Sequence, residues 1–428
     1  MGNFSTKYLD HTLGLYRDPY RYISRLCKQY DTDVVETRLL LQKFICIKGE
    51  EAARLFYDNA KFSRQNVAPA RIQKTLFGKG GVQGMDEAAH KHRKAMFMQM
   101  LVPEKITALS TIAQRRWEQR IGEWDGADNI CLYTQTRNLL TQAVCEWAGV
   151  PLESAEVEKR SKELASLYEE AGSIGISHWK ARRARKQSEK WLGTVIEALR
   201  ANPKAKPDTP AQVIALHKDI DDQLLDVNVA AVELNNLLRP TVAVSIYILQ
   251  CAHALQSYPN WRARLREGTP EMLDNFVQEV RRFYPFFPFA VARVKHPFTW
   301  HDQQFSKGRK VLLDLYGTNH DLRIWEKPDT FYPQRFADAA DNTYRLIPQG
   351  GGDHYRNHRC PGEWVAIEQM KIATQALLRC DYEVSAEHLD IDMKTLPARP
   401  SSKFVLRRVR QHSMAKGGRK GDGYLPST

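Results

Sequence analysis

The sequence predicts a single large, mainly α-helical domain with a minor β part. Three observations indicate this fold class. The chain has 428 residues, of which 43% are hydrophobic and 26% charged, as in ordinary globular proteins. From about residue 50 to residue 283, apolar residues recur mostly at helical spacing and no linker interrupts them. Short β-rich runs lie before and after that region. We therefore expect one domain over residues 1–411 and a disordered, basic tail over 412–428.

The individual elements follow from local patterns. Strands are expected where short runs of β-branched and aromatic residues occur between turn residues. Helices are expected where apolar residues return every three or four positions. The expected strands are VVETRLLL (34–41), KFICIKG (43–49), AVARVKHPFTW (290–300), KVLLDLYG (310–317) and KFVLRRVR (403–410). The expected helices begin at Glu50 and include residues 138–150, 156–172, 188–202 and 222–255, with another after Gly362.

Composition excludes several classes of protein. The net charge of +13 comes partly from KARRARKQSEK (180–190), but no interleaved aromatic residues accompany it, so we do not expect a nucleic-acid partner. The most apolar segment, 224–249, contains Asp226, Glu233 and Arg239, which argues against a membrane span. The N-terminus lacks the apolar region of a signal peptide, and seven cysteines without one indicate reduced thiols. A cytoplasmic location is therefore expected.

The segment IPQGGGDHYRNHRCPGEWVAIEQMKIATQALL (347–378) carries the strongest chemical signal. Cys360 lies in a loop rich in glycine and basic residues, directly before a predicted helix. Both features favour a thiolate. That thiolate can be a nucleophile, a zinc ligand or a haem ligand. Zinc binding by His354, His358 and Cys360 fits poorly, because structural zinc sites use paired ligands. A nucleophile needs a base that sequence alone does not locate.

Two further motifs precede this loop at specific spacing. EVRR (279–282) places Glu279 and Arg282 three residues apart, and FYPQRF (331–336) contains Arg335. In this order, with Cys-Pro-Gly following, the motifs resemble the cytochrome P-450 superfamily over essentially the whole chain except the tail. The resemblance implies the cytochrome P-450 fold, in which Glu279, Arg282 and Arg335 together brace the cysteine loop.

The resemblance also implies a cofactor, haem b (iron protoporphyrin IX). Cys360 then corresponds to the axial thiolate ligand of the haem iron. His358, two residues earlier, corresponds to a position that binds a haem propionate. AAHKHRK (88–94) resembles the helix whose basic residues hold the propionates, which makes His92 a second expected contact.

The long apolar helix departs from the superfamily pattern. Where an acid and a threonine are expected, this chain has NNLLRPTVAV (235–244), with Arg239 next to Pro240. This replacement resembles the fatty-acid peroxygenase branch. A buried guanidinium needs a partner, its planar fork matches a carboxylate, and no acid lies within one helical turn of Arg239. Pro240 lacks an N–H and crowds the carbonyl of Asn236, so we expect the helix to open there.

The expected activity is therefore hydroxylation of long-chain fatty acids at the α or β carbon, with hydrogen peroxide as the oxidant. Arg239 would hold the substrate carboxylate, which then replaces the missing acid in proton transfer. By resemblance, an apolar slot for the alkyl chain is expected, although the same residues also suit an ordinary core. Gln83 occupies a position where hydroxylating relatives have Gln and the alkene-forming relative has His. The expected slot residues are Leu76, Phe77, Phe286 and Phe289.

Three alternatives stay open. The first is a decarboxylase that makes terminal alkenes from the same substrates. The second is a monooxygenase that receives electrons from a redox protein docked on the basic run 180–190, whereas the leading hypothesis requires no such partner. The third is a haem protein that binds fatty acid without turnover.

Overall fold

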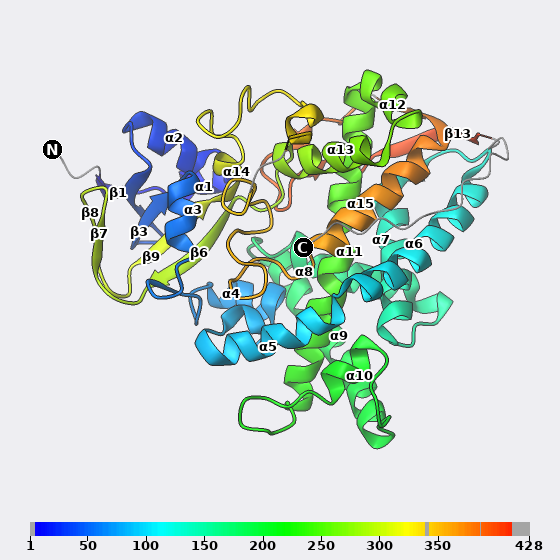
Figure 1. The fold of residues 1–428 in the computed structure, drawn as a ribbon, viewed down its shortest axis with the longest axis horizontal. Helices are drawn as coiled ribbons and strands as arrows, with labels where there is room; N and C mark the ends of the chain where they lie inside the picture. The colour runs from blue at the N-terminus through cyan, green and yellow to red at the C-terminus, as the bar shows by residue number, and fades with distance from the viewer. Residues whose placement is uncertain (1–4, 339–341, 386, 413–428) are drawn as a thin grey trace.

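The computed structural model describes residues 5–338, 342–385 and 387–412. Helices form the larger part of the molecule around the long helix α11 (Val227–Ser257), and a smaller β part lies beside the N-terminus (Figure 1). The predicted fold class is confirmed. The tail predicted for residues 412–428 lies, apart from His412, outside the described residues.

Helix α11 lies at the centre of the helical part because it is apolar on all sides. Nearly every residue from Ala230 to Leu255 is buried. The side chain of Asp226 caps its start by accepting a hydrogen bond from the N–H of Asn228 at 2.8 Å. No helix in the described part of the chain is long and apolar enough to cross a membrane. The other long helices are α5 (Glu87–Met100), α6 (Pro103–Trp124), α7 (Leu132–Ala148), α8 (Val157–Glu169), α9 (Ile176–Ala201), α13 (Pro270–Phe283) and α15 (Glu363–Leu378).

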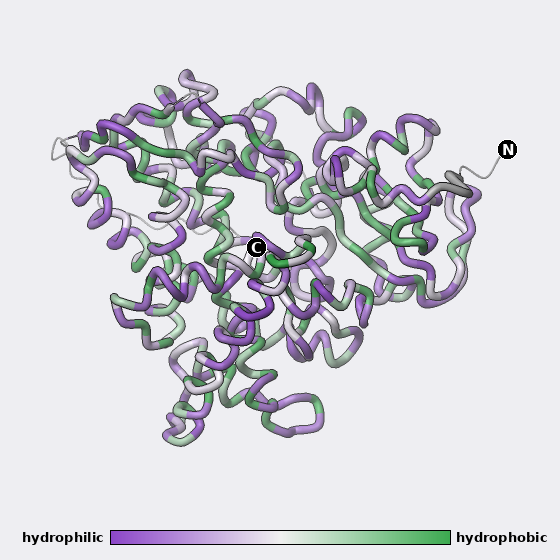
Figure 2. Tube along the Cα trace, turned by 180° about the vertical axis from the view of Figure 1, so that it is seen from behind, coloured by the Kyte–Doolittle hydropathy of each residue, from purple (hydrophilic) through white to green (hydrophobic). Residues whose placement is uncertain are grey.

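Shorter helices connect these elements, and many of the outer loops and turns are hydrophilic (Figure 2). A π-helical turn, η1, follows α4 directly and leads toward α5. The short helices are α1 (Thr12–Arg17), α2 (Tyr22–Gln29), α3 (Glu50–Phe56), α4 (Ala70–Ile72), η1 (Gln73–Phe77), η2 (Val82–Gly84), η3 (Ser154–Glu156), α10 (Pro210–Ala215), α12 (Pro259–Arg266), α14 (Leu315–Thr318) and η4 (Pro333–Phe336).

The main sheet has six strands in the order β1-β2-β3-β9-β6-β4. Its central pairs are antiparallel except that β3 runs parallel to β9. Smaller sheets join β10, β13 and β5, then β11 and β12, and finally β7 and β8. The strands are β1 (Ser5–Asp10), β2 (Val34–Leu39), β3 (Gln42–Ile47), β4 (Phe62–Ser63), β5 (Ile130–Cys131), β6 (Phe289–Val294), β7 (Phe298–Trp300), β8 (Gln303–Phe305), β9 (Lys310–Asp314), β10 (Cys380–Val384), β11 (Ile391–Asp392), β12 (Arg399–Pro400) and β13 (Val405–Gln411).

Several predicted strands differ from the observed ones for local reasons. The strand expected over 310–317 ends at Asp314, whose side chain caps α14. The strand predicted over 34–41 ends at Leu39, because Leu40 and Leu41 adopt φ angles of 51° and 61° in the hairpin turn to β3. The run 290–300 divides into β6 and β7. Pro297 lies between the two strands and has no N–H to continue a ladder.

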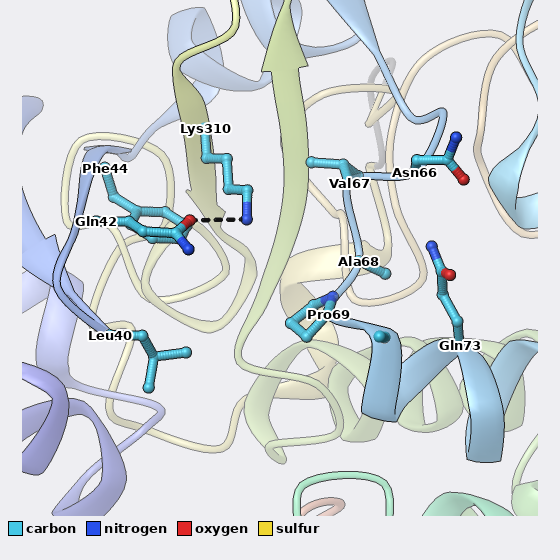
Figure 3. A pocket seen from close by; sticks show the side chains of 10 residues that line it. Leu40, Gln42, Phe44, Asn66, Val67, Ala68, Pro69, Gln73 and Lys310 are labelled. Atoms are coloured by element: carbon cyan, nitrogen blue, oxygen red, sulfur yellow. Dashed lines mark hydrogen bonds between the residues drawn. The ribbon is translucent and has the colours of Figure 1, made fainter.

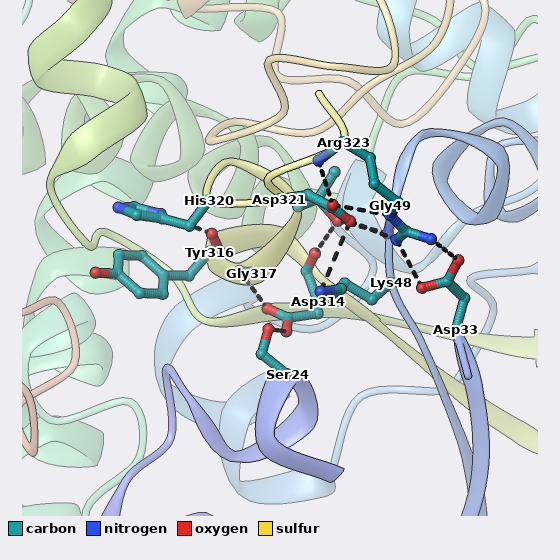
Figure 4. A network of polar contacts seen from close by, with 11 residues as sticks. Ser24, Asp33, Lys48, Gly49, Asp314, Tyr316, Gly317, His320, Asp321 and Arg323 are labelled. Carbon is teal, nitrogen blue, oxygen red and sulfur yellow. Dashed lines mark hydrogen bonds and ion pairs between the residues drawn. The ribbon is translucent and has the colours of Figure 1, made fainter. Parts of the chain in front are cut away.

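A polar network connects the end of β9 to the turn that follows it (Figure 4). The carboxylate of Asp314 accepts hydrogen bonds from Ser24 Oγ and from the N–H of Gly317, each at 2.6 Å. Burial raises the pKa of Asp314 to about 6, although these hydrogen bonds oppose the shift. The network fixes α14, and Asn319, which follows α14, reaches the cysteine loop described below.

Candidate active site

The cysteine loop, residues 347–362, turns back on itself just before α15. The N–H of Cys360 donates to the carbonyl of Gln349 at 3.0 Å. Gly350 makes this close return possible, because it has a φ of 93° and a Cβ there would lie 2.9 Å from the hydroxyl of Tyr57. The loop therefore presents Cys360 in a fixed position.

Cys360 is partly exposed, whereas five of the other six cysteines are buried. Burial raises the pKa of its thiol, and Glu363 adds to this, whereas the N–H of Gly362 and the cations of Lys94 and Arg281 oppose it. The cations and the helix start thus favour the thiolate as expected, but desolvation outweighs them and the pKa of the thiol is raised. A metal ion bonded to the sulfur would keep it deprotonated.

A buried ion cluster lies behind the loop. Glu279 receives two hydrogen bonds from Arg282, each of 2.7 Å, and one of 3.0 Å from Arg335. Arg282 also donates to the carbonyl of Asn319 at 2.9 Å, and the Asn319 side chain accepts from the N–H of Ile347 at 2.9 Å. The three residues expected to form a brace therefore meet, and Asn319 links them to the start of the loop.

A second buried pair lies next to the first. Arg281 on α13 donates to Glu363 at the start of α15 and, at 3.1 Å, to the side chain of Gln349. Arg359 donates to the other oxygen of Glu363 at 2.6 Å. Arg359 and Glu363, which lie on either side of Cys360 in the sequence, are thus held in place by ion pairs. Sequence reasoning missed this pair, although Arg281 is adjacent to Arg282 in the motif.

A basic and aromatic group lies on the other side of the loop. His358 stacks on His90 of α5 with ring centroids 3.9 Å apart, and its Nε2 lies 3.6 Å from Asp86. Burial lowers the pKa of His358 to about 4, and Asp86 opposes this only in part. Lys94, one turn from His90, donates to the loop carbonyls of Asn357 and Arg359. Helix α5 thus contacts the loop through His90 and Lys94.

The structure does not bring His92 to the loop. Its ring faces the opposite side of α5, where Nε2 lies 2.9 Å from the carbonyl of Lys218. His90 and Lys94 are four residues apart and share one helix face, whereas His92 is two residues from each and points away. That spacing is the signal that separates the two histidines.

The surroundings of Cys360 fit a haem. Arg64 is desolvated, which lowers its pKa to about 10, and its Nη1 atom is buried without a hydrogen-bond partner. A guanidinium near His358 that has one nitrogen without a partner suits a propionate. Among the described residues, no group of three or more His, Cys, Asp or Glu side chains is placed to hold a metal ion, which removes the zinc alternative. Cys360 would hold the haem iron, and Arg64 and His358 would hold propionates.

Arg239 lies on α11, close enough to Cys360 for the two charges to interact. It is 5% exposed, and burial lowers the pKa of its guanidinium to about 9. Its Nη2 lies 3.4 Å from the side-chain oxygen of Asn236, and its Nε atom is buried without a partner. No carboxylate among the described residues lies within ion-pair distance of Arg239. The guanidinium is therefore available to an anion from outside the protein.

Asn236 separates Arg239 from the nearest acid on the helix. Its amide nitrogen donates to Glu233 at 3.0 Å and to Gln83 at 3.2 Å. Glu233 is itself paired with Arg93 at 2.8 Å. Asn236 thus connects Gln83 to Arg239. Sequence reasoning did not identify the part played by Asn236.

Helix α11 continues through Pro240 without a break. The expectation that the proline opens the helix is wrong, because packing on all sides holds the backbone in place. The effect of Pro240 is local: it supplies no N–H to the carbonyl of Asn236.

The four residues expected to line an alkyl slot do not share one cluster. Leu76, Phe77 and Phe286 belong to the large helical core, where the ring of Phe286 stacks on Tyr247 at 4.4 Å. Phe289 packs instead against the cluster between the main sheet and α2. Phe287, adjacent to Phe286, packs against both the helical core and the cluster that includes residues of β6 and β9.

Comparisons with known proteins agree with this geometry. A sequence model of the cytochrome P-450 family matches residues 270–408. The putative cytochrome P-450 138 of Mycobacterium tuberculosis is 22% identical over 84% of each chain. Solved structures are more similar. Cytochrome P-450SP alpha in complex with (R)-ibuprofen has 46% identity, a TM-score of 0.91 and coverage of 94% of this chain and 99% of that one.

Two further structures contain fatty acids. Cytochrome P-450EX alpha with myristic acid is 40% identical, with a TM-score of 0.92 and coverage of 96% of this chain and 100% of that one. A variant of cytochrome P-450 OleT with arachidonic acid is 29% identical, with a TM-score of 0.93 and coverage of 97% and 100%. With the cysteine loop, its buried brace and these similarities together, the chain belongs to the cytochrome P-450 family.

Proposed function

We propose that this chain is a haem-thiolate peroxygenase that uses hydrogen peroxide to hydroxylate long-chain fatty acids at the α or β carbon. The observation that carries the proposal is Arg239, a buried guanidinium without a carboxylate partner that lies near Cys360. Solved relatives that contain myristic or arachidonic acid support the choice of substrate. A bound haem supplies the oxidising chemistry, in which one oxygen atom of the peroxide enters a C–H bond and the other leaves as water.

Arg239 is suited to bind and orient the substrate. Its fork matches both oxygens of a carboxylate, and burial strengthens the pair because water does not compete. Holding the carboxylate also fixes the α and β carbons next to it, which accounts for part of the rate gain. Asn236, which approaches the guanidinium from one side, limits the directions from which the carboxylate can pair with it.

The bound carboxylate also replaces a catalytic acid. At the position of the usual acid, α11 has Arg239 and Pro240, and the nearest acid, Glu233, is already paired with Arg93. A carboxylate oxygen held by Arg239 can accept a proton from one oxygen of hydrogen peroxide and return it to the other. The substrate therefore completes the proton-transfer machinery. No redox partner protein is required, because the peroxide is the oxidant.

Gln83 favours hydroxylation over decarboxylation. A neutral amide does not titrate as an imidazole does, and here Gln83 accepts a hydrogen bond from Asn236. The decarboxylase alternative predicts terminal alkenes as the main product. A cytoplasmic site of action is also part of the proposal, since all seven cysteines are free thiols.

The decisive experiment supplies hydrogen peroxide and myristate to the purified, haem-loaded protein without any reductase. We expect 2- and 3-hydroxymyristate, measured by gas chromatography and mass spectrometry. No turnover would contradict the proposal, and turnover only with a reductase and a redox protein would favour the monooxygenase alternative. A change in the haem spectrum on adding myristate, without product, would identify a fatty-acid binder.

A further inference from the structure

A separate cleft of about 380 Å³ lies at the edge of the β part, between the β2–β3 hairpin and the segment 66–73 (Figure 3). None of the residues assigned above to the haem or to the substrate carboxylate lines it. Its volume falls within the range of roughly 300–1,000 Å³ that small-molecule sites occupy. The lining residues are Leu40, Gln42, Phe44, Asn66, Val67, Ala68, Pro69, Ala70, Gln73 and Lys310.

One cation, Lys310, lines this cleft, and a second, Arg293, lies beside it. Lys310 on β9 lies directly opposite Arg293 on β6 in the register of the sheet. Like charges at opposite positions destabilise a sheet, and no salt bridge offsets them in the described part of the chain. The neighbouring Arg309, by contrast, pairs with Glu36 at 3.0 Å. Arg309, directly before β9, thus has a carboxylate partner, whereas Lys310 and Arg293 face each other without one among the described residues.

The two cations have neutral partners that line the cleft. Lys310 Nζ donates to the side-chain oxygen of Gln42 at 3.0 Å, a contact visible in Figure 3. Arg293 Nη2 donates to the carbonyl of Asn66 at 3.2 Å, and its Nε atom is buried without a partner. Burial, followed by the charge of Arg293, lowers the pKa of Lys310. The end of the cleft therefore has unsatisfied positive charge.

The rest of the cleft is mainly apolar. Phe44 and Val67 are buried at its floor, and Pro69 forms part of one wall. Leu40 at the rim is 52% exposed, and its neighbour Leu41, at the tip of the hairpin, is 78% exposed. Apolar side chains that remain exposed beside a cleft indicate a ligand that covers them.

From this arrangement we propose that the cleft binds a second fatty-acid molecule, with its carboxylate at Lys310 and Arg293 and its alkyl chain along Leu40, Phe44 and Val67. An anionic head and an apolar tail match the cationic end and the apolar walls. The choice of a fatty acid rests on the proposed function. The cleft itself does not, because its residues are distinct from Arg239 and from the cysteine loop.

The site lies next to the segment that leads into the helical core. Gln73 lines the cleft and begins η1, the turn that also carries Leu76 and Phe77. A fatty acid in the cleft would hold this turn against the sheet. The second molecule is therefore placed to affect the inner site without contacting the haem.

The test measures how many myristate molecules the haem-loaded protein binds. Calorimetry below the critical micelle concentration counts all bound molecules, whereas the Soret band reports only the one near the haem. We expect two molecules per protein, of which one changes the Soret band. Lys310→Gln should leave a single molecule and an unchanged Soret titration, and Lys307→Gln, an exposed lysine nearby, should retain both.

Two further measurements distinguish binding in this cleft from binding at Arg239. Arg239→Ala should lose the Soret-linked molecule and keep the one at Lys310, so each site can fail independently. Tetradecan-1-ol, which has the same chain without the charge, should bind the cleft at least about tenfold more weakly. A single bound molecule in the unmodified protein, two in Lys310→Gln, or equal affinity for the alcohol would each overturn the inference.

Discussion

Buried arginines lie in two regions around Cys360, and their environments differ. On α13, Arg282 forms two hydrogen bonds of 2.7 Å with Glu279, and Arg281 pairs with Glu363. On α11, Arg239 has a single weak contact at 3.4 Å, to the neutral side chain of Asn236. Burying a charge costs free energy that only a partner recovers. Where the charge maintains the fold, the chain supplies a carboxylate. At Arg239 the described part of the chain supplies none, and the proposed function assigns that carboxylate to the substrate.

The largest expected effect comes from removing a carboxylate from the paired region. Glu279→Gln leaves Arg282 and Arg335 buried without their countercharge and should lower the free energy of unfolding by about 3–5 kcal/mol. Urea unfolding followed by circular dichroism measures this. Glu326→Gln is the control, since Glu326 is exposed and lies 3.6 Å from Lys327. Equal midpoints for both variants would show that the paired region contributes no more than a surface ion pair.

Asp314 is a buried carboxyl that has no arginine partner in the described part of the chain, in contrast to Glu279 and Glu363. Asp314 accepts hydrogen bonds from Ser24 and Gly317 and has no ion pair with any described residue; burial raises its pKa to about 6 from 3.8, although the charge of Lys48 opposes this. The folded protein thus binds this proton more tightly than the unfolded chain. The stability that this provides is complete below about pH 4 and is lost as the pH rises through about 6, by about 3 kcal/mol.

The measurement for Asp314 is the free energy of unfolding at several pH values between 4 and 7. Asp314→Asn cannot titrate, so its profile should lack this decline. Parallel profiles for the two proteins would mean that the carboxyl is not held in its neutral form, and that a buried charge is tolerated there without a cation.

The unpaired region should respond in the opposite way. Arg239→Leu should reduce peroxide-driven hydroxylation of myristate by about 100-fold, because two charge-assisted hydrogen bonds to the substrate are lost. The free energy of unfolding should stay the same or increase, since an unpaired buried charge is removed. Arg183→Ala, at an exposed arginine on α9, should leave activity unchanged. Retained activity in Arg239→Leu would mean that the substrate carboxylate binds elsewhere.

The smallest expected effect comes from giving Arg239 an internal partner. Asn236→Asp places a carboxylate oxygen where the amide oxygen now lies, 3.4 Å from Nη2. The new acid should compete with the substrate and weaken myristate binding by about tenfold, measured from the Soret shift. Asn236→Leu controls for the loss of the amide without adding charge. If both variants bind myristate equally well, the absence of an internal carboxylate is not what makes Arg239 available.

The residues that sequence located correctly depend on local spacing. Glu279 and Arg282 are three residues apart on one helix, so their pairing follows from helix geometry. The isolation of Arg239 also follows from the absence of acids three and four residues away. What sequence did not give depends on how separate elements pack. The choice of His90 over His92 requires the rotation of α5 against the loop, and the higher pKa of Cys360 requires its burial.

The same reasoning applies to Phe289. It begins β6, one residue before the strand expected from the sequence, and the side of the sheet that it faces depends on where α2 packs. Single residues in a strand alternate between two environments, and the sequence around Phe286 to Phe289 is aromatic on both. Apolar patterning therefore predicts that such residues are buried without assigning them to a core cluster or to a ligand slot.

The link from Arg282 through Asn319 to Ile347 has an evolutionary consequence. The hydrogen bonds described above for the cysteine loop come from α13, from the turn after α14 and from Lys94 of α5, and none of them comes from α11. Substitutions in α11 can therefore accumulate while the Cys360 thiol keeps its place. The residues of the central helix that take part in proton transfer can therefore change during evolution without loss of the fold. A new reaction can arise in this way on an existing fold.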